Sequence, residues 1–198
     1  MTGDKVTTRR TSEERRQQIA AAAVTCLTLY GYAGLTARRV ASQAGISLGH
    51  LTYHYATMDE VLAAAYAQVA HDLTVPEPAP SATPAARLDS YLNAVFAPEF
   101  LTQAQLRLRV DLWSAAQSYP AVAQIELDLQ NRNRATIEGL LTAICDPWKT
   151  ARIPMVEAFV LAVMDGLWLE YMRHQDLDTV HAAIEACVLF ARMRLGGT

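Results

Sequence analysis

LTARRVASQAGISLGHLTYH, residues 35–54, predicts two short helices joined by a tight turn. Thr36 and Ser47 are side chains that cap helix starts, and Gly45 accepts the backbone conformation that such a turn needs. This spacing is typical of a helix-turn-helix motif, although Ala-Gly turns between short helices also occur in purely structural hairpins. Apolar residues stand where the two helices would pack on each other and on a preceding helix: Val40, Ala41, Ala44, Ile46 and Leu51.

The flanking sequence predicts further helices on both sides of this motif. Ser12, followed by Glu13, Glu14 and a periodic apolar pattern, predicts a capped helix that ends at Gly31. Thr57 and Glu60 form a capping box for a longer helix that continues toward Leu73. The four prolines of residues 76–84 then interrupt helical structure. Helical patterns follow at about 85–97, 101–118, 121–143, 154–174 and 178–195.

The expected fold is therefore all-α, with about nine helices in total and no strand pattern. We expect an N-terminal three-helix helix-turn-helix domain within residues 12–72 and a larger helical domain over residues 84–198.

Charge is distributed unevenly along the chain. Residues 1–58 have a net charge of +4 and residues 59–198 a net charge of −7, although the whole chain is acidic. A basic N-terminal part suits binding to a polyanion, but the halves of ordinary proteins also differ by several charges. The N-terminus has no apolar segment of the secretory kind, and we expect a cytoplasmic protein with no membrane partner.

The features that enzymes and metalloproteins require do not occur in this sequence. There is no glycine-rich phosphate loop, nucleophile elbow or pair of carboxylates placed to flank a cleft. Cys26, Cys145 and Cys187 lie far apart and predict neither a disulfide framework nor a metal site. The sequence therefore favours a binding protein that is not an enzyme and has no resident cofactor.

Two C-terminal segments are more apolar than the surface of a monomer normally is. Residues 156–172 are apolar around nearly the whole circumference of a helix, and the last helix extends beyond one apolar stripe. These helices suggest an isologous four-helix interface in a homodimer, or else deep burial within one monomer core. The candidate interface residues are Phe159, Val163, Leu167, Ile184 and Val188.

The stretch from Arg15 to Val69, with GYAGLTARRVASQAGISLGHLTYHYATMDEVL at its centre, resembles the DNA-binding domain of the TetR family. DLWSAAQSYPAVAQ and MDGLWLEY resemble the betaine-regulator-like ligand domain of one subgroup of that family. The resemblance implies that the second helix of the motif enters the major groove, with Ser47 as its cap, and that neighbouring side chains contact phosphates. The implied DNA-binding residues are Thr36, Arg38, Ser47, Leu48, Gly49, His50, Thr52, Tyr53 and His54.

The sequence departs from the family pattern at three positions. Thr52 stands where tyrosine is common, Tyr55 where phenylalanine is usual, and Met58 where a phosphate-binding lysine is usual. The missing lysine removes one phosphate contact. Basic residues before and at the start of the first helix either compensate along the DNA backbone or minor groove, or belong to a solvated tail. They are Lys5, Arg9, Arg10, Arg15 and Arg16.

In this family the larger domain usually binds an effector that changes the affinity for DNA. Aromatic and polar side chains of the helical domain either line such a pocket or belong to the core, and Asp165 either meets a cationic ligand group or bonds to a neighbouring helix. The candidates are Phe96, Trp113, Gln117, Met164, Asp165 and Trp168.

The sequence therefore predicts a homodimeric transcriptional regulator that a small-molecule effector releases, as a repressor, from a pseudo-palindromic double-stranded operator. The alternative is an architectural or partner-binding factor on the same fold that binds DNA and has no ligand.

Overall fold

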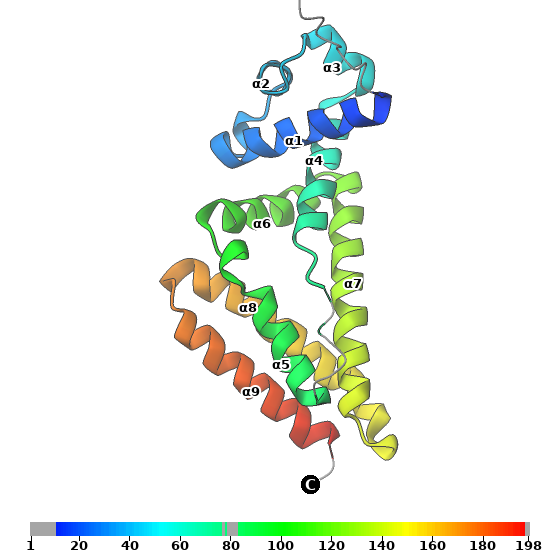
Figure 1. Ribbon diagram of the computed structural model, residues 1–198, viewed down its shortest axis with the longest axis vertical. Helices are drawn as coiled ribbons and strands as arrows, with labels where there is room; N and C mark the ends of the chain where they lie inside the picture. The colour runs from blue at the N-terminus through cyan, green and yellow to red at the C-terminus, as the bar shows by residue number, and fades with distance from the viewer. Residues whose placement is uncertain (1–10, 77, 79–82, 197–198) are drawn as a thin grey trace, which may run out of the picture. The chain divides into compact units, whose positions relative to one another are not determined.

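The computed structural model describes residues 11–76, 78 and 83–196, and every helix that it contains is shown in Figure 1. Within these residues the chain forms nine α-helices and three short 3-10 helices (η), with no strand. The predicted all-α architecture is confirmed. The α-helices are α1 (Ser12–Tyr30), α2 (Ala37–Gln43), α3 (Leu48–His54), α4 (Met58–Asp72), α5 (Pro84–Val95), α6 (Gln103–Ala116), α7 (Pro120–Ile144), α8 (Ile153–His174) and α9 (Leu177–Leu195). The 3-10 helices are η1 (Tyr32–Gly34), η2 (Pro98–Phe100) and η3 (Pro147–Arg152).

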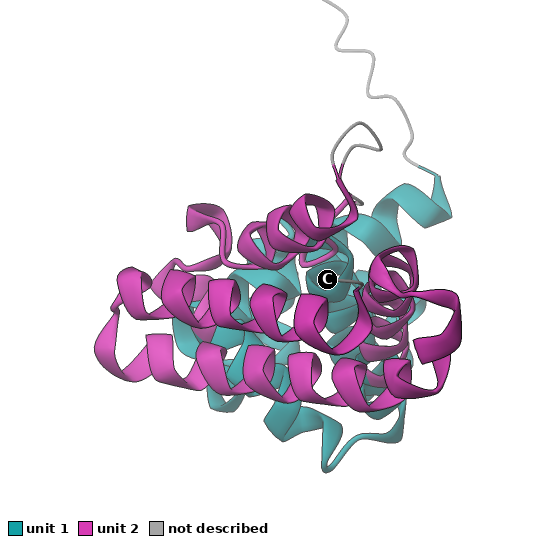
Figure 2. Ribbon diagram, turned by 90° about the horizontal axis from the view of Figure 1, so that it is seen from below, with its two compact units in different colours: residues 1–72, 107–126 teal, residues 73–106, 127–198 magenta. Residues whose placement is uncertain are grey.

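The chain divides into two compact units, coloured separately in Figure 2. Unit 1 consists of residues 1–72 and 107–126, and unit 2 consists of residues 73–106 and 127–198. Residues 107–126, the greater part of α6 and the first turns of α7, therefore pack with the N-terminal helices rather than with the rest of the C-terminal region. Helices α6 and α7 each continue from one unit into the other.

Unit 1 is built on α1, which packs against α2, α3 and α4. The helix begins with a capping box in which Thr11, not Ser12, is the N-cap: Glu14 N donates to Thr11 Oγ1, and Thr11 N donates to Glu14 Oε2. It ends at Gly31, whose φ of 65° lies in the region that favours glycine. The core of this unit includes the fully buried side chains of Ile19 and Val61.

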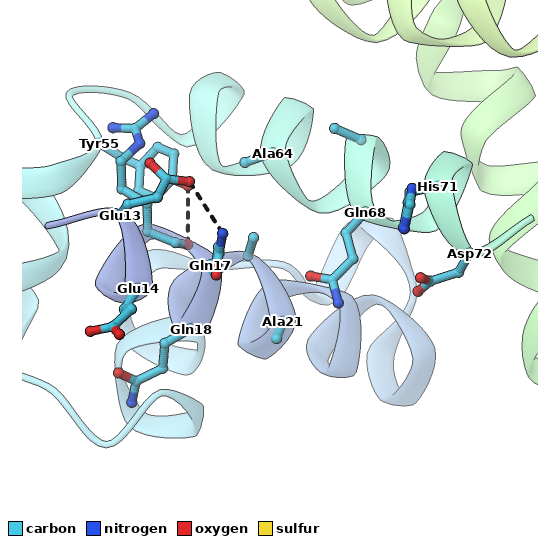
Figure 3. Close-up of a pocket in the computed structure, with 13 residues that line it drawn as sticks. Glu13, Glu14, Gln17, Gln18, Ala21, Tyr55, Ala64, Gln68, His71 and Asp72 are labelled. Atoms are coloured by element: carbon cyan, nitrogen blue, oxygen red, sulfur yellow. Dashed lines mark hydrogen bonds between the residues drawn. The ribbon is translucent and has the colours of Figure 1, made fainter. Parts of the chain in front are cut away.

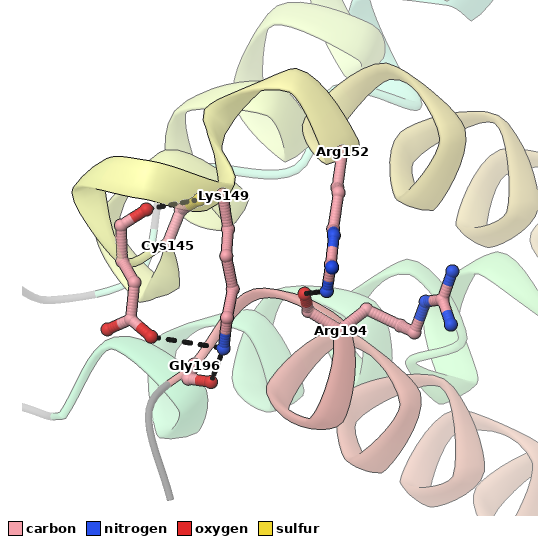
Figure 4. Close-up of polar contacts among 6 residues, drawn as sticks. Cys145, Lys149, Arg152, Arg194 and Gly196 are labelled. Carbon is pink, nitrogen blue, oxygen red and sulfur yellow. Dashed lines mark hydrogen bonds and ion pairs between the residues drawn. The ribbon is translucent and has the colours of Figure 1, made fainter.

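In unit 2, α9 packs against both α5 and α8. The C-terminal end of α9 is tied to η3 by several polar contacts (Figure 4). Asp146 N donates to Leu195 O at 2.8 Å, Lys149 Nζ donates to Gly196 O, and Arg152 Nη1 donates to Arg194 O at 3.3 Å. These bonds satisfy backbone carbonyls that the end of a helix leaves without partners inside the helix.

Candidate nucleic-acid interface

The predicted caps and turn of the helix-turn-helix segment are present in unit 1. Thr36 Oγ1 accepts from Arg39 N at 3.4 Å, and Ser47 Oγ accepts from His50 N at 3.2 Å. Gly45 has a φ of 66°, and the chain turns there so that Ile46 N donates to Ala41 O at 3.0 Å. Local side-chain chemistry thus fixes where α2 ends and where α3 begins.

Helix α3 has a single buried side chain, Leu51; His54 at its end is half-buried, and its other residues are exposed. Tyr53 is 81% exposed and Leu48 43% exposed, which is unusual for side chains with so much apolar area. Gly49, His50 and Thr52 are exposed as well. The residues predicted to enter the major groove are therefore accessible, and their role in base contacts stays a prediction.

The rings on the exposed side of α3 form a continuous group. The His50 and His54 rings stack with centroids 5.8 Å apart, and Tyr53 meets His54 edge-on at 5.1 Å. Partial burial lowers the pKa of His54, and the nearby His50, Arg15 and Arg16 lower it further. The free protein therefore favours the neutral form of this imidazole, and an approaching phosphate would favour the charged form.

Arg16 supports α3 from α1. Its guanidinium donates to His54 O and lies 4.1 Å from the ring centroid of Tyr55, while the Tyr55 hydroxyl donates to Arg16 O at 3.2 Å. Arg16 is one of the basic residues predicted either to track DNA or to belong to a solvated tail, and in the structure its side chain contacts the C-terminal end of α3. Apolar periodicity gives no sign of this contact, because the two partners are 38 residues apart.

The other basic residues near α1 and α2 differ in whether their side chains are exposed or bonded within unit 1. Arg38 is exposed at the start of α2. The neighbouring Arg39 donates to Gly34 O at 2.8 Å and lies over the Tyr30 ring, so it serves the structure of unit 1. Arg15 donates to Gln18 Oε1 at 2.8 Å. Lys5, Arg9 and Arg10 lie outside the described residues.

A groove of about 770 Å³ lies between α1 and α4 within unit 1 (Figure 3). Alanines of both helices line it, among them Ala21 and Ala64, and polar side chains such as Gln17 and Gln68 flank them. Arg16 and Tyr55 also line it, so the contact that supports α3 borders this groove. No motif in the sequence predicts this groove.

The candidate effector-binding residues fall in both units. In unit 2 the rings of Phe96 and Trp168 stack with centroids 4.7 Å apart, and both side chains are buried, as is Met164. Asp165 is exposed. In unit 1, Trp113 is half-buried and Gln117 is exposed.

The candidate dimer residues separate into two groups. Phe159 is 42% exposed, and Val163 and Val188 are half-buried. Ile184 is fully buried within the protomer and Leu167 nearly so, hence these two side chains belong to the core of unit 2. Phe159 contacts Phe190 of α9, with ring centroids 4.4 Å apart, and other large apolar side chains of α8 and α9 reach solvent. They are Met155, Leu169, Leu189 and Met193.

The part of the chain that the structure describes lacks two features. No helix there is long and apolar enough to cross a membrane. No group of three or more His, Cys, Asp or Glu side chains is arranged there to hold a metal ion.

Two family models match the chain. Residues 19–65 match the model for bacterial regulatory proteins of the tetR family, and residues 84–194 match the model for the C-terminal region of BetI-type transcriptional repressors. No curated protein matches the chain at a significant level.

Several solved structures share the fold. A transcriptional regulator from Rhodococcus sp. Rha1 is 23% identical, with a TM-score of 0.76 over 92% of this chain and 98% of that chain. A TetR-family member from Streptomyces coelicolor A3 is 28% identical, with a TM-score of 0.64 over 88% and 98% of the two chains. The multidrug binding protein EbrR in complex with ethidium is 27% identical, with a TM-score of 0.63 over 87% and 98%.

Proposed function

The chain belongs to the TetR family of bacterial regulatory proteins, with a C-terminal region of the BetI repressor type, and we propose that it is a dimeric repressor released from its operator by a small organic effector. Family membership makes it a DNA-binding transcriptional regulator. The repression, the effector and the dimer belong to the proposal.

The observation that supports the proposal best is the exposed side of α3. This helix buries one side chain of its own and exposes Leu48 and Tyr53, while the cap at Ser47 and the contact of Arg16 with His54 O hold its two ends. Such a rigid helix with exposed aromatic and polar side chains suits the major groove, where base edges offer hydrogen bonds and thymine methyl groups offer apolar contact.

The exposed apolar side chains of α8 and α9 support the dimer. Met155 and Phe159 of α8 and Leu189 and Met193 of α9 are each more than 40% exposed. Large apolar side chains exposed on two packed helices are typical of protein interfaces, and a two-fold axis would pair these helices with those of a second copy. Two recognition helices would then read half-sites about one helical turn, or slightly more, apart.

The effector is proposed to be a small organic molecule with an aromatic part. The supporting observations are the stacked aromatic rings of Phe96 and Trp168 in unit 2, and the similarity to EbrR, a multidrug binding protein solved with ethidium. Helical bundles bind such molecules between aromatic walls.

A gel-shift titration tests the proposal. The purified protein is titrated against DNA from directly upstream of its own gene at near-physiological salt, with an unrelated fragment of equal length as competitor. Saturable binding that resists the competitor is expected. A small-molecule screen for loss of that complex then identifies the effector, whereas binding that the competitor removes equally would favour an architectural role.

A further inference from the structure

Two tyrosines from segments far apart in sequence contact each other in unit 1. Tyr32 lies in η1, between α1 and α2, and Tyr119 directly precedes α7. Their hydroxyl groups are hydrogen-bonded to each other, and their ring centroids are 5.8 Å apart with the planes at 56°. The contact joins the start of the helix-turn-helix segment to the turn between α6 and α7.

A carboxylate of α6 binds the same short helix from a second direction. The backbone N–H of Tyr32 donates to Asp111, whose pKa is raised by partial burial and lowered by Arg107 and by this hydrogen bond. Tyr32 is thus held at its backbone by Asp111 and at its hydroxyl by Tyr119. Two attachments at opposite ends of one residue restrict both its position and its rotation.

The position of η1 determines where α2 begins. Gly34, the last residue of η1, approaches Tyr30 so closely that a Cβ atom there would lie 2.3 Å from the Tyr30 Cβ. Its carbonyl accepts from Arg39 of α2, and only Leu35 separates it from Thr36, the N-cap of α2. The connection between Tyr32 and the helix-turn-helix is short and closely packed, so a displacement of η1 would also displace α2.

We propose that Asp111 and Tyr119 are positioning residues for DNA binding, which hold the helix-turn-helix in its operator-binding orientation through their bonds to Tyr32. Both residues lie in the region that matches the BetI-type C-terminal model, yet they pack in the unit that contains α3. The inference rests on the proposed function, because it presupposes a specific operator.

The test measures the operator affinity of full-length variants. The probe is the DNA sequence that the native chain selects from a random-sequence pool, so that native binding is established first. Tyr32→Phe and Tyr119→Phe each remove one hydroxyl and keep the ring. We expect each to weaken operator binding about fivefold, the scale of one neutral hydrogen bond, and the double variant to show the same fivefold loss.

Asp111 is tested with a pair of variants. Asp111→Ala removes the acceptor for Tyr32 N–H and should weaken operator binding at least as much as Tyr119→Phe, whereas Asp111→Asn keeps an acceptor oxygen and should restore most of the affinity. Tyr171→Phe, a half-buried tyrosine of unit 2, is the matched control. Affinity for unrelated DNA should stay within twofold in all folded variants, because the phosphate-binding cations are intact.

The outcomes separate the two proposals. If the native chain selects no sequence, the proposed function fails. If the native chain binds its operator but both phenylalanine variants bind equally well, or if their effects multiply in the double variant, the positioning role is overturned. Circular-dichroism melts show which variants are folded at the assay temperature. Equal loss of operator and unrelated DNA binding in folded protein would also overturn the inference, because it would indicate a general defect rather than altered orientation.

Discussion

The exposed side of α3 and the exposed sides of α8 and α9 differ in chemistry although both contain large side chains in contact with solvent. On α3 the exposed group combines imidazole, phenol and hydroxyl groups with Leu48. On α8 and α9 the large exposed side chains include Met155, Phe159, Leu189 and Met193, which offer almost no hydrogen-bonding capacity. The surface of α3 thus has hydrogen-bond donors and acceptors that can pair with a polar partner. The surface of α8 and α9 can be stabilised only by burial of its apolar side chains away from water.

This difference assigns different partners to the two surfaces. Base edges and phosphates require hydrogen bonds and charge, so only the α3 surface suits DNA. The apolar surface of α8 and α9 suits a copy of itself, because apolar side chains are stabilised by any complementary apolar face. A change to α3 should therefore remove operator recognition without loss of the dimer, whereas a change to α8 and α9 should remove the dimer and operator binding with it.

The largest expected effect comes from charging the apolar surface. Phe159→Glu combined with Val163→Glu should raise the dimer dissociation constant by at least about 100-fold, since two charges would be buried without partners. Sedimentation velocity measures this, and operator binding should fall with the dimer because one half-site gives few contacts. Arg173→Glu, on the exposed last turn of α8, is the control for charge alone. An unaltered dimer would mean that these side chains serve the core of unit 2.

The next largest effect is confined to DNA. Replacing His50 and Tyr53 with alanine should weaken specific operator binding by roughly 100-fold, because each base-contacting side chain contributes about 1–3 kcal/mol of discrimination. The dimer and the melting temperature should be unchanged, since both residues are exposed and Leu51 anchors the helix. Competition gel shifts provide the measurement. Unchanged affinity would show that α3 is not the recognition helix.

Sequence predicted the local structure of the DNA-reading unit well, because caps and turns depend on neighbouring residues. Thr36, Gly45 and Ser47 occupy the predicted positions, since each satisfies or permits backbone geometry within three residues of itself. The start of α1 was displaced by one residue, because Thr11 and Ser12 are both good caps and only Thr11 has a glutamate three residues later. At Thr57 the cap is partial: Glu60 N donates to Thr57 Oγ1, but Glu60 Oε2 accepts from Ala56 N.

Long-range contacts were not predictable in the same way. Nothing in the pattern of α6 indicates that residues 107–126 pack with the N-terminal helices, or that Arg16 supports the end of α3. Helix α8 has apolar residues on nearly every side, so its sequence does not show which face is buried. Leu167 and Phe159 were therefore both predicted to lie in the dimer interface, although only Phe159 is exposed. Amphipathic periodicity separates inside from outside only when the two faces differ in polarity.

A smaller effect tests the departure from the family pattern at Met58. This residue is half-buried at the first position of α4, where the family pattern places a phosphate-binding lysine. Met58→Lys should tighten operator binding severalfold at low salt and steepen the dependence of log affinity on log salt by about 0.9, the value of one further phosphate contact. Asn131→Lys, at an exposed position of α7 in unit 2 and outside the proposed dimer surface, is the control for added charge. An unchanged slope would show that the DNA backbone does not pass the start of α4.

The smallest expected effect is a pH dependence of operator affinity, which the dimer dissociation constant should not share. Burial and the charges of Arg15 and Arg16, together with His50, lower the pKa of His54 in the free protein. A bound phosphate would raise that pKa, so operator binding would take up protons and tighten as the pH falls. Between pH 7.5 and pH 6 we expect a roughly two- to threefold gain in affinity, less than the tenfold per pH unit of a full proton. His54→Gln should reduce this gain and leave the dimer dissociation constant, measured over the same range, unaffected. If the native protein and this variant respond identically to pH, the phosphate does not approach His54, and the DNA-contacting surface of α3 ends before its last residue.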